Sequence, residues 1–328
     1  MNRLFTNLKQ EKMNISIRII VFLGSLWLLT GCDTGQNSST PNFAEVPKSG
    51  YVEVGNARLE YKIEGTGIPV IVPGSTVYDP RTFSENLRKD CQLIFYNMRW
   101  FTPDYVPKDL KNEITLDTIL SDIDRLRQQL GLEKVAIMGH SLHGVIALEY
   151  ARRYPEHVTH VIAVAAPAQK GEAAGKLENE YWSGYASQMR KMKFQYNWDL
   201  HKDSIAAMDI ADGAIATYIN NAPIYFYNPD YDSKWLWEGV RLNVPVMSHV
   251  FTDVFFDFKL TNGPTIEVPA FVAVGYFDFS APPVLWDDQK SAFSNLTYVV
   301  FNKSGHSPQL EEAELFDQKL LDWLKGTK

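Results

Sequence analysis

One serine stands at a sharp turn between an apolar run and a helical pattern. Residues 135–138 are apolar, Gly139-His140-Ser141 follows, and helical spacing begins at Leu142. A serine in such a strained turn presents its hydroxyl above the edge of a sheet, and the first backbone N–H groups of the next helix face the same point. We therefore predict Ser141 as a nucleophile and the Leu142 N–H as one donor of an oxyanion hole.

The turn departs from the usual G-x-S-x-G spacing at one position. His143 stands where the second glycine is usual, and Gly144 follows one residue later. The imidazole of His143 either packs beneath the turn or adds a second titratable ring to the site, and packing is the commoner fate of a lone histidine. The sequence leaves both alternatives open.

Two further polar residues follow buried runs in the way that the serine does. A serine hydroxyl needs a base to react at neutral pH, and His306 lies in the loop between the last apolar run and the last helical pattern. Asp278 follows the run before it, where a carboxylate can orient the imidazole and stabilise its charged form. The preceding run ends in Ala165-Ala166-Pro167-Ala168, which offers no carboxylate. We predict a triad of Ser141, Asp278 and His306, in that order along the chain.

A second oxyanion donor is predicted in the loop after an earlier strand. Pro73-Gly74-Ser75 follows the apolar run 69–72, and the backbone N–H of Ser75 is our choice. An ordinary Pro-Gly turn is the alternative. We expect no metal and no cofactor, because the sequence has no metal-binding motif and Gly65-Thr66-Gly67 precedes a strand rather than a helix.

The elements that must position these residues have the pattern of a mostly parallel sheet with helices on both faces. Residues 51–54 and 58–63 alternate in polarity, which predicts a hairpin. Short continuous apolar runs predict strands that are buried on both faces: 69–72, 93–96, 135–138, 158–165, 271–274 and 298–301. Helical spacing predicts helices at 116–130, 142–154 and 311–324.

A segment of another character interrupts this pattern. Residues 169–264 are rich in large aromatic side chains and show no strand pattern, and 176–192 and 203–220 have helical spacing. We predict an inserted helical cap at 169–264 on a core made of 51–168 and 265–328. Most of the aromatic side chains are expected to pack inside the cap, and a minority to line a pocket.

The N-terminus has the pattern of an export signal. Basic residues precede an apolar run at 19–29 that is too short to span a bilayer comfortably. Leu29-Thr30-Gly31-Cys32 resembles the bacterial lipoprotein motif, which implies a signal peptide at 1–31 and a lipidated Cys32. The resemblance implies export to the bacterial cell envelope and a lipid anchor in a membrane, with residues 32–50 as a flexible tether. The alternative is an ordinary export signal or an uncleaved anchor in which Cys32 is incidental.

Charge and cysteine content exclude two classes of protein. The net charge of −7, with acidic and basic residues interleaved, provides no basic stripe for nucleic acid. If Cys32 carries lipid, Cys91 is the only other cysteine, so no intramolecular disulfide is possible.

Taken together, the motifs from about Tyr51 to Leu324 resemble α/β-hydrolases of the proline-iminopeptidase-like, or S33 peptidase, branch. The matching segments are Gly139-His140-Ser141, 275–283 and 305–311. Two family features are altered. The His-Gly of the family's oxyanion loop is Pro73-Gly74 here, and the common Asp-x-Arg-Gly after the next strand is Asn97-Met98-Arg99-Trp100. The resemblance implies an α/β-hydrolase fold and hydrolysis of a small ester or amide through an acyl-serine.

Several activities fit this resemblance. An aminopeptidase needs a cap carboxylate for the substrate's amino group, and the candidates are Glu178, Glu180, Asp209, Asp212 and Glu238. A carboxylesterase or lactonase needs none. A tethered binding protein without catalysis is a less favoured alternative, because it has no use for a complete triad. Haloalkane dehalogenases and epoxide hydrolases use an aspartate at the elbow, so Ser141 argues against both.

Overall fold

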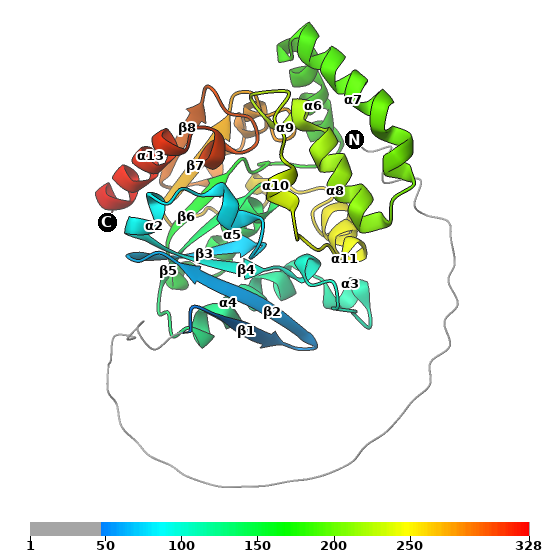
Figure 1. Cartoon of the computed structure of the whole chain (residues 1–328). Helices are drawn as coiled ribbons and strands as arrows, with labels where there is room; N and C mark the ends of the chain where they lie inside the picture. Colours follow the sequence, from blue (N-terminus) through cyan, green and yellow to red (C-terminus); the bar gives the residue numbers. More distant parts are fainter. Residues whose placement is uncertain (1–46, 328) are drawn as a thin grey trace, which may run out of the picture. The chain divides into compact units, whose positions relative to one another are not determined.

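The computed structural model of the protein describes residues 47–327 (Figure 1). The predicted signal peptide, Cys32 and most of the predicted tether lie outside these residues. Within them, no helix combines the length and the apolar character that crossing a membrane requires.

The described chain begins with the predicted hairpin. β1 (Ser49–Val54) pairs antiparallel with β2 (Ala57–Glu64) across a turn in which Gly55 has a φ of 62°. That left-handed conformation favours glycine, which explains why the turn occurs there. β1 includes the last two residues of the predicted tether, Ser49 and Gly50.

An eight-stranded sheet forms the centre of the described chain, in the order β1-β2-β4-β3-β5-β6-β7-β8 (Figure 1). The remaining strands are β3 (Ile68–Gly74), β4 (Cys91–Asn97), β5 (Val135–His140), β6 (Val158–Val164), β7 (Ala270–Gly275) and β8 (Leu296–Phe301). β2 pairs antiparallel with β4, and all pairs from β4 to β8 are parallel. Each predicted strand is confirmed, because a run buried on both faces has a strong sequence signal. The predicted burial of 298–301 on both faces is wrong, because β8 is the edge strand and most of its residues are only half-buried.

Helices cover both faces of this sheet, as predicted. One face packs against α4 (Leu116–Gln129) and α5 (Leu142–Arg153), and the other against α2 (Leu87–Asp90) and α13 (Ala313–Gly326). Thr115 caps α4 by accepting the Thr118 N–H at 3.2 Å, and Gly131 ends it with a φ of 67°.

The remaining short elements outside the cap helices are helical turns. They are η2 (Asp79–Thr82), η3 (Arg99–Phe101), α3 (Leu110–Glu113), η4 (Pro155–His157), η6 (Leu260–Asn262), η7 (Pro283–Trp286), η8 (Lys290–Ala292) and α12 (Pro308–Glu311).

The segment between β6 and β7 is helical, but its helices differ from the predicted ones. They are α6 (Glu172–Tyr185), α7 (Gln188–Ala206), α8 (Ile210–Asn220), α9 (Ala222–Tyr225), α10 (Lys234–Trp237), α11 (Val244–His249) and the π-helix η5 (Val250–Val254). The predictions of continuous helices over 176–192 and 203–220 are wrong, because each range contains a break. Ser187 starts α7 by accepting the Arg190 N–H, and Asp209 starts α8 by accepting the Ala211 N–H. Both are residue types that favour the N-cap over the helix interior.

Candidate active site

The turn after β5 holds Ser141 in a conformation that few non-glycine residues adopt. Its φ is 56° and its ψ is −128°, and such strain is characteristic of functional turns. The Ser141 N–H donates to the Val164 carbonyl at 2.8 Å, which fixes the turn against β6.

Two glycines make this turn possible. A Cβ at Gly139 would lie 2.0 Å from the carbonyl oxygen of His143, and a Cβ at Gly144 would lie 2.8 Å from the Cβ of Ala166. Both distances are too short for a side chain. The close approach to β6 therefore falls at position 144, which explains how position 143 accepts a histidine.

The predicted base and acid meet at the ends of β8 and β7. His306 Nδ1 and Asp278 Oδ2 are 2.7 Å apart, and the Asp278 side chain is fully buried. Asp278 Oδ1 accepts the N–H groups of Ser280 at 2.9 Å and Ala281 at 2.8 Å. With both oxygens engaged, the carboxylate is fixed in one orientation. His306 then carries its proton on Nδ1 and has Nε2 available as a base.

The loop that carries His306 is fixed through its backbone as well. The His306 N–H donates to the Tyr225 carbonyl at 2.5 Å, and His140 Nε2 lies 2.5 Å from the His306 carbonyl oxygen. Burial, followed by the nearby charge of His306, lowers the pKa of His140 to about 3. A neutral His140 therefore donates from Nε2 and links the nucleophile turn to the loop of the base.

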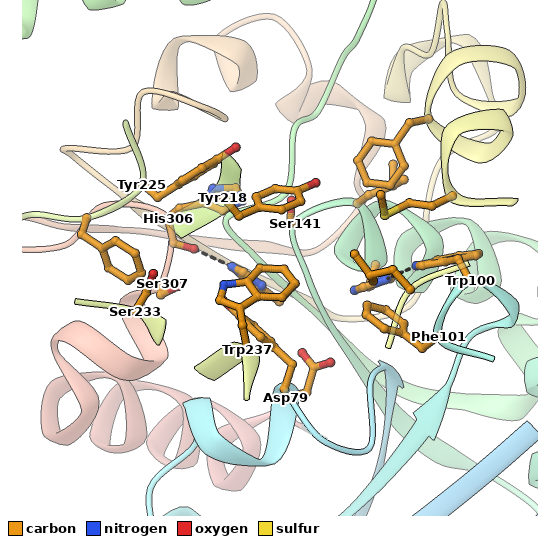
Figure 2. A pocket seen from close by; sticks show the side chains of 18 residues that line it. Asp79, Trp100, Phe101, Ser141, Tyr218, Tyr225, Ser233, Trp237, His306 and Ser307 are labelled. Atoms are coloured by element: carbon orange, nitrogen blue, oxygen red, sulfur yellow. Dashed lines mark hydrogen bonds between the residues drawn. The ribbon is translucent and has the colours of Figure 1, made fainter. Parts of the chain in front are cut away.

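Ser141 and His306 line one cavity, which contains about 790 Å³ of empty space including its open mouth (Figure 2). Within residues 47–327, the Ser141 hydroxyl makes no hydrogen bond to the His306 ring. Catalytic hydrogen bonds of this kind commonly tighten only when a substrate is bound. The structure thus brings the three predicted residues to the carboxyl ends of β5, β7 and β8.

Aromatic and aliphatic side chains from both the core and the cap form most of the cavity wall. In Figure 2, Trp100 and Phe101 lie to one side of Ser141, and Tyr225 and His306 lie to the other. The cap contributes Tyr218, Tyr225, Phe226, Trp237, Leu242, Met247 and Phe251. The cavity therefore suits a substrate with apolar groups on either side of its reacting bond.

His143 belongs to this wall. Its ring stacks on Trp100 with 5.6 Å between the ring centroids, and its Nε2 accepts the Trp100 Nε1–H at 3.3 Å. Burial lowers the pKa of His143 to about 4. His143 is therefore a neutral packing residue of the cavity wall, and its Nε2 is engaged.

The two predicted oxyanion donors differ in their availability. Leu142 begins α5, and within the described chain its N–H has no acceptor, so it is free to bind an oxyanion. The Ser75 N–H donates to Asp79 Oδ2 at 2.6 Å, and the next N–H, that of Thr76, donates to Asn97 Oδ1 at 2.7 Å. The loop predicted to supply the second donor is thus present, with its N–H groups already bound.

Asp79 is the site residue that the sequence patterns did not reveal. It begins η2, its side chain is buried, and it lines the cavity together with Ser141. It belongs to no motif that the sequence shows. Its nearness in sequence to Ser75 is the signal that identifies it. The five cap carboxylates considered for an amino group do not line the cavity.

No group of His, Cys, Asp and Glu side chains with the arrangement of a metal site occurs among residues 47–327.

Comparison with known proteins identifies relatives of this chain. A family model described as alpha/beta hydrolase fold matches residues 72–203. The AB hydrolase superfamily protein YclE of Bacillus subtilis (strain 168) is 34% identical over 274 residues, which covers 81% of this chain and 95% of that protein. A proline iminopeptidase of Lactobacillus delbrueckii subsp. bulgaricus is 24% identical over 257 residues, or 71% of this chain and 80% of that protein.

A solved structure shares the architecture. An alpha/beta fold family hydrolase from Bacillus anthracis str. Sterne superposes with a TM-score of 0.61 at 20% sequence identity, and the match covers 84% of this chain and 98% of that chain. This likeness confirms the predicted fold class.

Proposed function

Because the chain belongs to the α/β-hydrolase fold family, we propose that it is a serine hydrolase that cleaves a small ester. The observation that carries this proposal is the 2.7 Å hydrogen bond between His306 and Asp278, on the cavity that the strained Ser141 also lines. Position 141 is a serine rather than the aspartate that epoxide hydrolases and haloalkane dehalogenases use.

The reaction follows from this arrangement. His306 Nε2 takes the proton of the Ser141 hydroxyl as Oγ attacks the carbonyl carbon of the substrate. Asp278 stabilises the imidazolium that forms, and the Leu142 N–H donates to the oxyanion. His306 then gives its proton to the leaving alcohol, which leaves an acyl-serine. His306 then takes a proton from a water molecule as its oxygen attacks the acyl carbon. His306 returns this proton to Ser141 Oγ as the carboxylic acid is released.

An ester is favoured over a peptide with a free amino group for one structural reason. An aminopeptidase of this fold needs a carboxylate in the cap that faces the nucleophile, and the five cap candidates do not line the cavity. Asp79 is the acidic side chain of the wall, and it lies on the core side in contact with Ser75. The likeness to a proline iminopeptidase therefore supports acyl transfer to a serine as the reaction class. It gives less support to a peptide with a free amino group as the substrate.

The proposal is tested by labelling and by substrate choice. We expect a fluorophosphonate probe to label the protein at Ser141, and Ser141→Ala to abolish labelling and turnover while the melting temperature is kept. Ser204→Ala, at an exposed position of α7, is the matched control. Short acyl esters are expected to be cleaved faster than aminoacyl-naphthylamides. Folded protein that resists the probe would refute a serine hydrolase, and cleavage confined to aminoacyl amides would replace the esterase with an aminopeptidase.

We also propose that the protein is exported and held at a membrane of the bacterial cell envelope by lipid on Cys32. The basic N-terminus, the apolar run 19–29 and the Leu29-Thr30-Gly31-Cys32 motif support this proposal. The substrate would then be met outside the cytoplasm.

A further inference from the structure

Asp79 places a carboxyl group at the position where the second oxyanion donor is expected. Its side chain is 2% exposed, and its Oδ2 accepts the Ser75 N–H at 2.6 Å. A Cβ on Gly74 would lie 2.2 Å from this oxygen, so the absence of a side chain at position 74 gives the carboxyl group its space. Asp79 also lines the cavity that contains Ser141, as Figure 2 shows.

No cationic side chain in the described part of the chain forms an ion pair with Asp79. Arg81 lies on the same helical turn, but its guanidinium donates to the carbonyl groups of Trp235, Leu236 and Glu238. Glu60 of β2 adds a second carboxylate to the neighbourhood, since its Oε2 accepts the Thr76 hydroxyl at 3.0 Å. No ion pair within residues 47–327 therefore stabilises an anionic Asp79.

The titratable groups that share the cavity with Asp79 are Tyr78, His140, His143, Tyr218, Tyr225 and His306. Burial keeps the pKa of the three tyrosines above the usual range and that of His140 and His143 below it. Burial likewise raises the pKa of Asp79 to about 7, although backbone N–H groups oppose the change. The neutral acid is thus a populated form.

We propose that Asp79 acts as a neutral acid that completes the oxyanion hole. Oδ2 accepts the Ser75 N–H, and the hydroxyl on Oδ1 donates to the oxyanion together with the Leu142 N–H. This inference rests on the proposed function, in which Ser141 is the nucleophile. A carboxylic acid held neutral by an apolar site is an effective oxyanion donor.

The electron and proton balance of the step is simple. As Ser141 Oγ bonds to the carbonyl carbon, the carbonyl π pair moves onto its oxygen, and the serine proton passes to His306. The Asp79 proton remains on Asp79 throughout. When the oxyanion collapses, the pair returns and the bond to the leaving group breaks. An ionised Asp79 would offer no proton, would repel the oxyanion and would still occupy the Ser75 N–H, so that form is inactive.

This role predicts an unusual pH profile. Activity needs a protonated Asp79, so it falls as pH rises through about 7. A hydrolase with only backbone donors keeps its activity on the alkaline side.

The test compares Asp79→Asn with Asp79→Ala on the full chain, with a short acyl ester as substrate. An asparagine amide keeps an acceptor for Ser75 and a donor for the oxyanion but cannot ionise. We expect Asp79→Asn to retain activity within about tenfold of wild type and to lose the alkaline fall. We expect Asp79→Ala to lose about 10²–10³ in kcat at every pH, the usual cost of one oxyanion donor. Asp104→Asn, at an exposed position, is the control and should keep the wild-type profile.

Two results would overturn this role. One is an Asp79→Asn variant that is as inactive as Asp79→Ala while both melt normally, because that result identifies an anionic carboxylate as the required form. The other is an alkaline fall that persists unchanged in Asp79→Asn. Fluorophosphonate labelling of wild-type Ser141 separates these results from a failure of the proposed function, in which the wild-type protein itself would not be labelled.

Discussion

At the scale of single residues, Asp278 is the most completely hydrogen-bonded carboxyl group of the site. One oxygen meets His306, and the other accepts the N–H groups of Ser280 and Ala281. These bonds fix the imidazole in one tautomer without any contribution from the substrate. In the proposed mechanism the base is therefore oriented before the substrate arrives, and this preorganisation lowers the cost of the reaction.

Replacing Asp278 by asparagine tests that orientation. The amide can keep the bonds to Ser280 and Ala281, but its NH₂ group favours the tautomer with the proton on Nε2. We expect Asp278→Asn to melt close to wild type and to lose about 10⁴ in kcat, as for other triads with this change. Asp322→Asn on the exposed side of α13 is the control. A loss of less than tenfold would remove Asp278 from the triad.

The site residues that sequence motifs predict are those that follow buried strands. Ser141, Asp278 and His306 lie in the segments that follow β5, β7 and β8 and within family motifs, and parallel strands bring their carboxyl ends to one edge. Asp79 also follows a strand, β3, but it lies on a helical turn outside any motif, so the sequence does not identify it. The engagement of the Ser75 N–H is equally invisible in sequence, because it depends on how that turn folds back.

At the scale of elements, helix α7 is connected to the loop of the base through one buried arginine. Arg190 donates to the carbonyl groups of Pro223 at 2.7 Å, Phe226 at 2.8 Å and Tyr227 at 2.6 Å. Tyr225, within the same segment, accepts the His306 N–H. The cap therefore helps to position the base, in addition to forming the wall of the cavity.

Replacing Arg190 by methionine tests this connection. Methionine keeps the apolar stem but leaves three carbonyl groups without the guanidinium. We expect a loss of about 2–4 kcal/mol in the free energy of unfolding, because a charged donor to buried acceptors is removed, together with a lower kcat. Lys202→Met, at an exposed position of the same helix, should change neither. An Arg190→Met variant with the unfolding free energy and kcat of wild type would show that residues 223–227 keep their position without the guanidinium.

The helices of the cap show where sequence patterns fail at this scale. The strands of the core were predicted because continuous burial produces continuous apolar runs. The cap helices are partly exposed and rich in aromatic side chains, so their periodicity is weak and their ends are set by local caps. Ser187 and Asp209 each accept N–H groups of the helix that follows. Those N-cap residues, rather than hydrophobic spacing, determine the breaks.

At the scale of the whole molecule, the inserted segment is closed at its base by its own two ends. Gln169 and Lys259 form an antiparallel bridge, the Lys170 N–H donates to the Phe258 carbonyl at 2.7 Å, and the Leu260 N–H donates to the Ala168 carbonyl at 3.0 Å. The cap thus begins and ends at one place beside β6. Core and cap both contribute side chains to the wall of one cavity.

The proposed anchor on Cys32 provides the prediction for the full-length chain. Expressed in a bacterium with labelled palmitate, the wild-type protein is expected to carry label and to partition into detergent, because acyl chains bury their methylene groups in the bilayer. Cys32→Ala is expected to lose the label. Cys91→Ala is the matched control, since the chain has two cysteines and Cys91 is buried in the core. Label retained in Cys32→Ala, or absent from the wild type, would refute lipidation at Cys32 and leave an ordinary export signal as the interpretation of residues 1–31.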